Sequence, residues 1–186
     1  MNIDQAISGR HSTREYTTQA VDEEVIVRLI HAASLAPSAM NRQPWRFTVV
    51  RDQALLDRIS REAKACMLET LDRGTQSERF HALLNDEHFQ IFYHAPVLIL
   101  ISADAPGQWV VEDCALAAQN LMLSACAEGL GTCWIGFAQR YLNTPQGKQA
   151  LKLAQAWVAV APIIVGHPKH APAPVAHQAP DIHWVG

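Results

Sequence analysis

The sequence has no excess of positive charge and no long apolar run. It carries 15 Lys and Arg residues against 18 Asp and Glu, for a formal net charge of −3, whereas a protein that binds nucleic acid needs a basic face. No apolar stretch reaches the roughly 18 residues of a membrane span, and the N-terminus lacks the basic start of a signal peptide. We therefore expect no nucleic-acid partner, no membrane contact and a cytoplasmic location.

Cysteine is scarce and widely spaced, which argues against a zinc site. The four cysteines form no Cys-x-x-Cys pair, the usual ligand spacing for zinc, and all lie in apolar segments: Cys66, Cys114, Cys126 and Cys133. We expect buried, reduced thiols, as in a protein of the cytoplasm, and no bound metal.

Two motifs of common active sites are missing as well. No Gly-x-Ser-x-Gly is present, which argues against a hydrolase with that nucleophile. The glycines at 129, 131 and 136 do not spell Gly-x-Gly-x-x-Gly, and a helical pattern rather than a strand precedes them. A Rossmann dinucleotide site is therefore not expected.

What the sequence does contain is a regular apolar pattern, sufficient for one domain over residues 1–186. Apolar residues make up 49% of the chain and charged residues 18%, so a core can form and disorder is not expected. Helical spacing predicts helices over residues 2–9, 22–35, 55–71, 110–128 and 144–154. Apolar and β-branched runs predict strands over residues 46–50, 96–102, 131–136 and 162–165.

A loop with short polar side chains is expected over residues 35–47, between the second helix and the first strand. Pro37 and Pro44 bracket it and restrict its backbone, and between them lie Ser38, Asn41 and Gln43. A hydroxyl and two amides on a rigid loop suit hydrogen bonding to the edge of a planar heteroatom ring. The simpler interpretation is a helix-to-strand connection of common composition.

A second polar stretch follows the N-terminal helix and contains Arg10, His11, Ser12 and Arg14. Guanidinium groups match the geometry of a phosphate, and hydroxyls add neutral donors. The simpler interpretation is a solvated basic turn. We call residues 10–14 the basic segment and residues 37–43 the polar loop.

Together, in this order and spacing, the basic segment, the polar loop and the glycine-rich residues 129–136 resemble the flavin-dependent nitroreductase family. The resemblance extends from the N-terminal helix to the turn at residues 166–168. It implies an α+β fold, an α/β/α sandwich in which helices flank a central, mostly antiparallel sheet. It also implies a homodimer in which a C-terminal arm is exchanged between the subunits.

The resemblance implies a tightly bound FMN at the dimer interface. Arg10, His11 and Ser12 would lie near its phosphate and ribityl chain, and Arg14 would stabilise negative charge on the pyrimidine side of the reduced ring. Backbone amides of Ile135 and Gly136 would reach the edge of the ring at N5. The polar loop, contributed by the other subunit, would hold the ring edge and line the substrate slot with Pro37, Ser38, Ala39, Met40, Asn41 and Gln43.

Residues 167–186 are rich in proline, alanine and histidine, a composition that favours an extended arm. In the family such an arm wraps around the partner, and residues 182–185 would form a strand on the partner's sheet. Where family members often carry Arg or Lys that reaches the FMN phosphate, this chain has His177. Lys169 is the alternative source of positive charge.

The function implied by the resemblance is NAD(P)H-dependent reduction of small electron acceptors such as nitroaromatics and quinones. NADH or NADPH would deliver a hydride to flavin N5, and the acceptor would then take it in a ping-pong cycle, with no side-chain acid or base required. Enzymes of the same fold that act on enones or halogenated phenols, or that degrade their own flavin, remain alternatives. So does a flavin-binding protein without catalytic activity.

Overall fold

Four strands form one antiparallel sheet in the computed structural model, which describes residues 1–69, 75–171 and 176–186. Their order across the sheet is β1-β2-β4-β3, and their bounds are β1 Trp45–Val50, β2 Val97–Ala103, β3 Gly131–Trp134 and β4 Val158–Gly166. Every pair of neighbouring strands is antiparallel. The predicted antiparallel sheet is confirmed.

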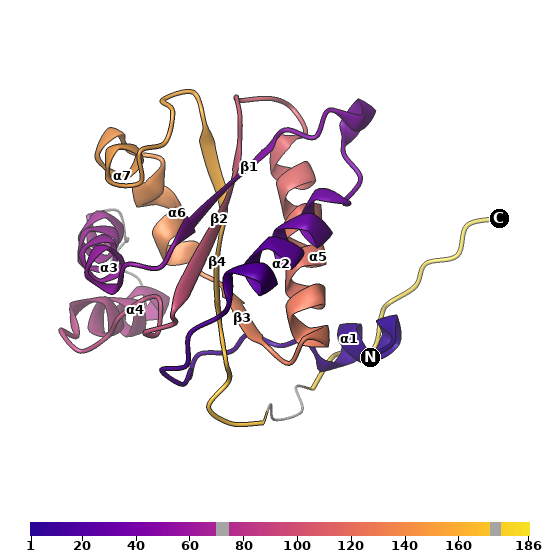
Figure 1. Ribbon diagram of the computed structural model, residues 1–186, viewed down its shortest axis with the longest axis horizontal. Coiled ribbons are helices and arrows are strands. Elements are labelled where there is room, and N and C mark those ends of the chain that lie inside the picture. Colours follow the sequence, from indigo (N-terminus) through magenta and orange to yellow (C-terminus); the bar gives the residue numbers. More distant parts are fainter. Residues whose placement is uncertain (70–74, 172–175) are drawn as a thin grey trace.

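Helices cover both faces of the sheet, which gives the predicted sandwich (Figure 1). On one face lie α2 (Glu23–Ser34) and α5 (Val110–Ala127). The other face is covered by α3 (Gln53–Leu68), α4 (Thr75–Asn85), α6 (Gly136–Leu142) and α7 (Pro145–Ala150). The short α1 (Ile3–Gly9) lies beside α5.

The central strand β2 shows why the sheet is buried on both sides. All seven of its residues are buried, and successive side chains of a strand point to opposite faces. Ile99 and Ile101 pack into the core under α2 and α5, whereas Leu98 and Leu100 pack into the core under the helices of the other face. A continuous apolar run is therefore what a strand between two helical layers requires.

The strand register separates the sheet into two ends. At one end Trp45 pairs with Ala103, which pairs in turn with Val158. At the other end, where β3 begins, Gly131 pairs with Gly166. The loop that precedes β1 therefore lies at the opposite end of the sheet from the entrance to β3 (Figure 1).

Several elements differ from the sequence-based expectation. Helices α4 and α6 were not predicted, since α4 has a polar sequence and α6 begins at a glycine. Strand β3 ends at Trp134, and β4 is longer than predicted. Residues 70 and 71, the expected end of the third helix, lie outside the described residues.

The expectation of four buried thiols is wrong for two of them. All four cysteines are free, and Cys114 and Cys133 are buried, but Cys66 and Cys126 are only half-buried. An apolar segment on a helix still turns one side toward the surface, so position in such a segment does not guarantee burial.

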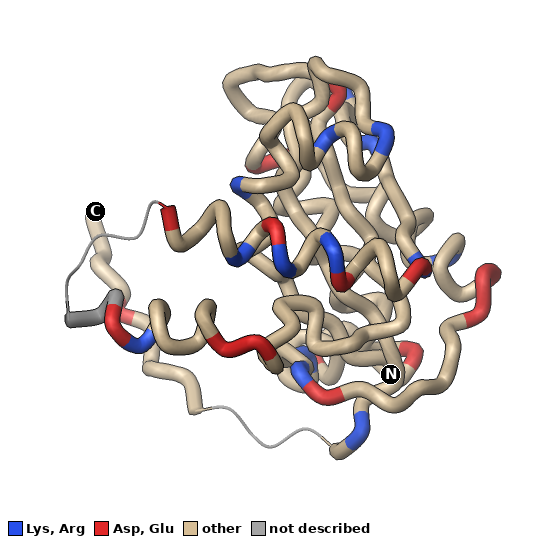
Figure 2. Tube along the Cα trace, turned by 90° about the vertical axis from the view of Figure 1, so that its left-hand side faces the viewer, with Lys and Arg blue, Asp and Glu red and all other residues tan. Residues whose placement is uncertain are grey.

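The charged residues on the outer helices are mixed in sign. Positive and negative side chains alternate along α3, the helix that faces the viewer in Figure 2. Within the described parts of the chain, no helix is both long and apolar enough to cross a membrane.

Candidate functional site

The chain that follows α1 lies along the open edge of β3. Ser12 forms a parallel bridge with Thr132, and the Thr13 N–H donates to the Thr132 carbonyl at 2.9 Å. Farther along, Tyr16 is bridged to Pro168, directly after β4. These backbone contacts hold the basic segment beside β3 within a single chain.

Gly131 makes this close approach sterically feasible. A Cβ atom at position 131 would lie 2.5 Å from Thr13 Oγ1 and 2.7 Å from Thr13 Cβ. Thr13 is itself buried, so its side chain has little room to move. The sequence identified Gly131 only as part of a turn, and its packing against Thr13 could not be read from spacing.

The imidazole of His11 is bonded within the basic segment. Its Nδ1 lies 3.0 Å from the Gly9 carbonyl oxygen, and its Nε2 lies 3.3 Å from Thr13 Oγ1. Because a carbonyl can only accept, Nδ1 is the donor in the bond to Gly9. His11 is thus held within the basic segment through both ring nitrogens, whereas Arg14 and Ser12 are exposed and Arg10 is half-buried.

Two residues that the sequence did not assign to the site lie next to Arg14. Burial raises the pKa of the Cys133 thiol, while Arg14, a hydrogen bond with Ser12 and the charge of Arg10 act in the opposite direction. Burial also raises the pKa of the Tyr93 hydroxyl, and Arg14 opposes this by its charge and a hydrogen bond. Tyr93 is far from Arg14 in sequence, so no local pattern could have revealed the contact.

The two predicted backbone amides after β3 differ in their availability. The Ile135 N–H donates to the Pro162 carbonyl at 2.8 Å and so extends the sheet. Gly136 is the first residue of α6, and a Cβ there would meet no described atom within 4 Å. Gly136 is therefore the amide of the pair that a ligand can approach.

The polar loop has an unusual backbone. Met40, Asn41 and Gln43 have φ values of 52°, 54° and 51°, a left-handed conformation that is strained for residues with a side chain. Ser38 Oγ accepts from the Gln43 N–H at 2.9 Å, and Gln43 Nε2 donates to Asn41 Oδ1 at 2.8 Å. The loop thus forms a small hydrogen-bonded unit, from which Met40 projects fully into solvent.

The structure does not bring all the predicted site residues together in one chain. Arg10, Ser12, Arg14 and Gly136 gather around β3, whereas the polar loop precedes Trp45 at the opposite end of the sheet. The basic segment and the polar loop therefore lie at opposite ends of the sheet, and Gly136, after the end of β3, lies level with the middle of its strands.

Of the two basic candidates in the arm, Lys169 lies beside the basic segment. Its N–H donates to the Glu15 carbonyl at 3.0 Å, and His170 Nε2 lies 3.3 Å from a Glu15 carboxylate oxygen. His177 is exposed, and the arm to which it belongs ends at a C-terminus that lies away from the body (Figure 1).

Comparison with known proteins identifies the family of this chain. The model of the nitroreductase family matches residues 7–167. A protein of Methanothermobacter thermautotrophicus, provisionally named an NADH dehydrogenase/NAD(P)H nitroreductase, is 33% identical over 141 residues, which are 73% of this chain and 61% of that protein. This chain thus spans less than two thirds of that relative.

Two further matches cover almost the whole chain. The 5,6-dimethylbenzimidazole synthase of Rhodospirillum rubrum is 26% identical over an alignment of 196 residues, 99% of this chain and 88% of that protein. The crystal structure of a nitroreductase from Bacteroides fragilis, with bound FMN, matches with a TM-score of 0.87 at 23% identity over 100% of both chains. With the family model matching most of its length, the chain belongs to the nitroreductase family.

Proposed function

We propose that this protein is an FMN-dependent oxidoreductase that uses NADH or NADPH to reduce small electron acceptors such as nitroaromatics and quinones. The observation that carries the proposal is the basic segment, fixed on β3 in a chain of the nitroreductase family. The FMN bound to the Bacteroides fragilis nitroreductase, which shares the fold, supports the choice of cofactor.

The residues around β3 fit an anionic cofactor with a planar ring. Arg10 and Arg14 supply two guanidinium groups and Ser12 a hydroxyl, all on a backbone that the sheet holds in place. Guanidinium groups bind phosphate well because their donors match its oxygens. The open space beside Gly136 leaves room for a ring to approach its amide. Lys169, next to Glu15, adds positive charge near the same segment.

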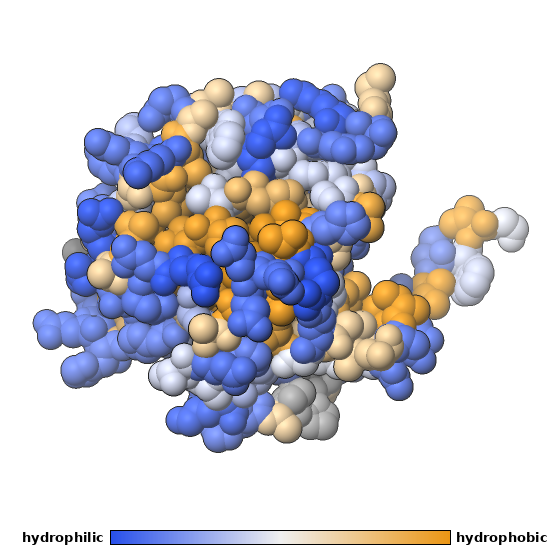
Figure 3. All heavy atoms as spheres, in the orientation of Figure 1, coloured by the Kyte–Doolittle hydropathy of each residue, from blue (hydrophilic) through white to orange (hydrophobic). Residues whose placement is uncertain are grey.

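The complete site is proposed to form between two subunits of a homodimer. The polar loop lies too far along the sheet to complete the site of its own chain, so a second copy would supply it. Apolar side chains are exposed around α1, α2 and α5, at Ile3, Ile7, Leu35, Val111 and Leu116, and Figure 3 shows hydrophobic atoms across this face and around α1. Large exposed apolar surface of this kind is typical of an interface.

A groove on the same face supports this arrangement. It has a volume of about 380 Å³, and it is lined mainly by apolar residues of α1, the end of α2 and α5, among them Met1, Ile3, Ala6, Leu123 and Ala127. In a dimer with twofold symmetry the same patch meets its own copy. Trp184 and Val185, at 86% and 87% exposure, would be covered if the arm lies on the partner.

When bound, FMN would supply the hydride chemistry, by accepting a hydride at N5 from the nicotinamide and passing it to the acceptor. The protein's own groups bind and orient. Arg10 and Ser12 would hold the phosphate end, Arg14 would place positive charge beside the pyrimidine edge, and the Gly136 amide would donate toward N5. The polar loop of the partner closes the slot, with Met40 at its tip.

Anaerobic titration of the purified protein with NADH and NADPH tests the proposal. We expect a flavin absorbance band that either nicotinamide bleaches and that a nitroaromatic or quinone restores. A protein that is colourless and cannot be reconstituted with FMN would refute the cofactor assignment. A bound flavin that no nicotinamide reduces would indicate a flavin-binding protein without this activity.

The match to a 5,6-dimethylbenzimidazole synthase favours one alternative, in which the protein degrades its own flavin. Under this alternative, aerobic incubation with FMN and NADPH would yield 5,6-dimethylbenzimidazole, detectable by mass spectrometry. Steady oxidation of NAD(P)H by an added acceptor, with the flavin unchanged, would favour the reductase.

A further inference from the structure

A buried carboxylate at the start of α5 accepts a hydrogen bond from the backbone of the polar loop. Asp113 lies in the first turn of α5 and is only 4% exposed. Its Oδ1 accepts a hydrogen bond from the Ala39 N–H at 2.8 Å. A carboxylate is favoured near the positive end of a helix, and hydrogen bonds to a charged group are stronger than those between neutral groups.

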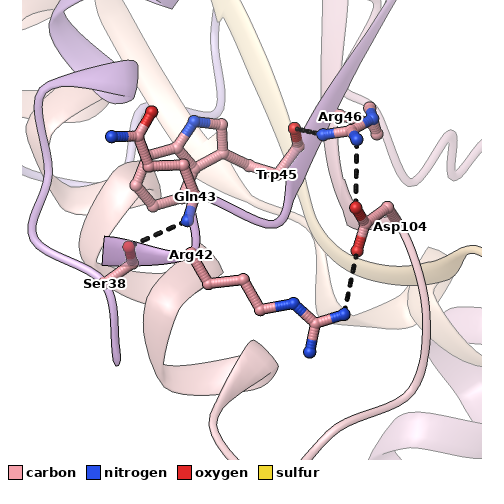
Figure 4. Close-up of polar contacts among 6 residues, drawn as sticks. All are labelled: Ser38, Arg42, Gln43, Trp45, Arg46 and Asp104. Carbon is pink, nitrogen blue, oxygen red and sulfur yellow. Dashed lines mark hydrogen bonds and ion pairs between the residues drawn. The ribbon is translucent and has the colours of Figure 1, made fainter. Parts of the chain in front are cut away.

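A second carboxylate fixes the other end of the loop. Asp104, which follows β2, lies 3.0 Å from Arg46 Nη2 through Oδ2 and 3.8 Å from Arg42 Nη2 through Oδ1 (Figure 4). Its own N–H donates to the Pro44 carbonyl at 2.9 Å. The loop is therefore anchored near its start by Asp113 and near its end by Asp104.

The strained backbone between these anchors explains why they are needed. Three residues of the loop have left-handed φ values, and such conformations persist only where the surroundings enforce them. Met40 is fully exposed and contributes no packing. The two anchors act together with hydrogen bonds inside the loop, from the N–H groups of Asn41 and Arg42 to the Ser38 and Ala39 carbonyls and from Gln43 to Ser38 and Asn41.

We propose that Asp113 is a positioning residue of the flavin site, whose bond to the Ala39 N–H holds the polar loop in the shape that binds FMN across the dimer interface, with Asp104 as the second anchor. The proposal rests on the proposed function, because it assumes that FMN binds between two subunits. Asp113 itself does not touch the flavin. Its effect passes through the loop.

Removing either partner of the bond tests this inference. Asp113→Ala removes the acceptor of the hydrogen bond. Ala39→Pro removes its donor, the Ala39 N–H, without altering α5. Proline is acceptable at the first position of a helical turn, and Ser38 already has the extended backbone that precedes proline (φ −142°, ψ 154°). We expect each variant to bind FMN about ten- to hundredfold more weakly, the size of a lost hydrogen bond to a charged group.

The effects of the two substitutions on FMN affinity should not be additive. If one bond carries both effects, the double variant will bind FMN about as weakly as either single variant. Asp113→Asn should recover most of the affinity, because the amide oxygen can still accept from the Ala39 N–H. Glu112→Ala is the matched control: it removes an exposed carboxylate from the same helical turn and should leave FMN affinity unchanged.

Mixed dimers separate positioning of the loop from general loosening of the fold. In a heterodimer of an Asp113→Ala chain and an Arg10→Ala chain, one site combines the intact loop of the second chain with the intact basic segment of the first. We expect this site to bind FMN with wild-type affinity, so that half of the sites are recovered. If Asp113→Ala instead loosens its own chain as a whole, neither site will recover.

The outcomes distinguish this inference from the function on which it rests. Wild-type protein that does not bind FMN would refute the proposed function. Wild-type protein that binds FMN, together with Asp113→Ala and Ala39→Pro variants of equal affinity, would overturn the positioning role alone. Additive effects in the double variant, or failure of the mixed dimer, would overturn it as well.

Discussion

The basic segment and the polar loop are held by different kinds of interaction. The basic segment lies against β3 through backbone hydrogen bonds and through the close contact of Thr13 with Gly131. The polar loop has no strand to pair with, and side chains anchor it instead, above all Asp113 and Asp104. Most side-chain substitutions should therefore leave the basic segment in place, whereas single carboxylates decide the shape of the loop.

The largest effect on stability is expected from adding a side chain at Gly131, where the backbone lies close to Thr13. Gly131→Ala would place a Cβ 2.5 Å from Thr13 Oγ1, so the basic segment must move away from β3. We expect the free energy of unfolding to fall by about 2–3 kcal/mol, as for other overpacked sites, and FMN binding to weaken with it. Denaturant unfolding measures the first effect and flavin fluorescence the second.

Gly136→Ala is the matched control for stability, because a Cβ there meets no described atom within 4 Å. It should leave the free energy of unfolding nearly unchanged. In the double variant Thr13→Gly, Gly131→Ala, the clash is removed and part of the loss should be regained. Equal stability of Gly131→Ala and wild type would mean that the close packing is not what holds the segment.

At the other end of the molecule, a pH effect is expected from Cys114. Burial, with Asp113 and Asp104 nearby, raises the pKa of this thiol from its ordinary value near 9 to about 12. The unfolded chain loses the proton above about pH 9 while the folded chain keeps it, so the stability that this group contributes is present below pH 9. It should be lost as the pH rises toward 12, at about 1.4 kcal/mol per pH unit.

Urea unfolding of wild type and Cys114→Ala at pH 8, 9 and 10 isolates this contribution, because other alkaline titrations are common to both. The difference in stability between the two proteins should be constant up to about pH 9 and should narrow above it. A difference that stays constant from pH 8 to pH 10 would show that the thiol titrates normally.

Within the basic segment, Arg14 and Arg10 should act differently on the flavin. Positive charge beside the pyrimidine edge favours the reduced ring, whereas a phosphate contact is indifferent to redox state. Arg14→Ala should therefore lower the midpoint potential by about 30 mV, equivalent to about 1.4 kcal/mol for two electrons, and Arg10→Ala should mainly weaken FMN binding. Potentiometric titration of both variants would show the contrast, and an unchanged potential in flavin-loaded Arg14→Ala would contradict it.

The smallest effect is expected at the tip of the polar loop. Met40 has a φ of 52°, and its side chain is fully exposed, so no packing is lost when it is removed. Met40→Gly should raise the free energy of unfolding by about 0.5 kcal/mol. The relief of backbone strain slightly exceeds the cost of the greater conformational freedom that glycine gives the unfolded chain. Met40→Val should lower it by about 1 kcal/mol, because a β-branched residue tolerates this conformation poorly. Thermal unfolding of the pair checks the sign, and equal stabilities would mean that the loop backbone is not strained.

The sequence predicted the sheet and most helices because their signals are local. The apolar run of β2 and the small-residue pattern of α5 follow from burial alone. The resemblance to the family supplied the residues of the site, and the fold it implied is confirmed. The predicted flavin contacts of Arg10, Arg14 and Gly136 remain predictions; the structure places both arginines close enough to Cys133 of β3 to act on its thiol.

What the sequence could not predict depends on contacts between distant parts of the chain. The left-handed backbone of Met40 and Gln43 depends on the interactions that hold the loop, since neither residue favours it by itself, whereas Asn41 adopts it more readily. The bonds of Asp113 to Ala39 and of Tyr93 to Arg14 join residues far apart in sequence. Such contacts can be located only when the order and register of the strands are known, because these decide which distant residues come together.

The parallel bridge between Ser12 and Thr132 also sets an order of events during synthesis. The basic segment is translated more than one hundred residues before its binding edge on β3 and the turn at Pro168. Pairings between such distant residues form slowly, and the N-terminal residues must wait unpaired until then. The basic segment therefore takes its place only after β3 has been made, and a nascent chain cannot hold the cofactor through this segment until then.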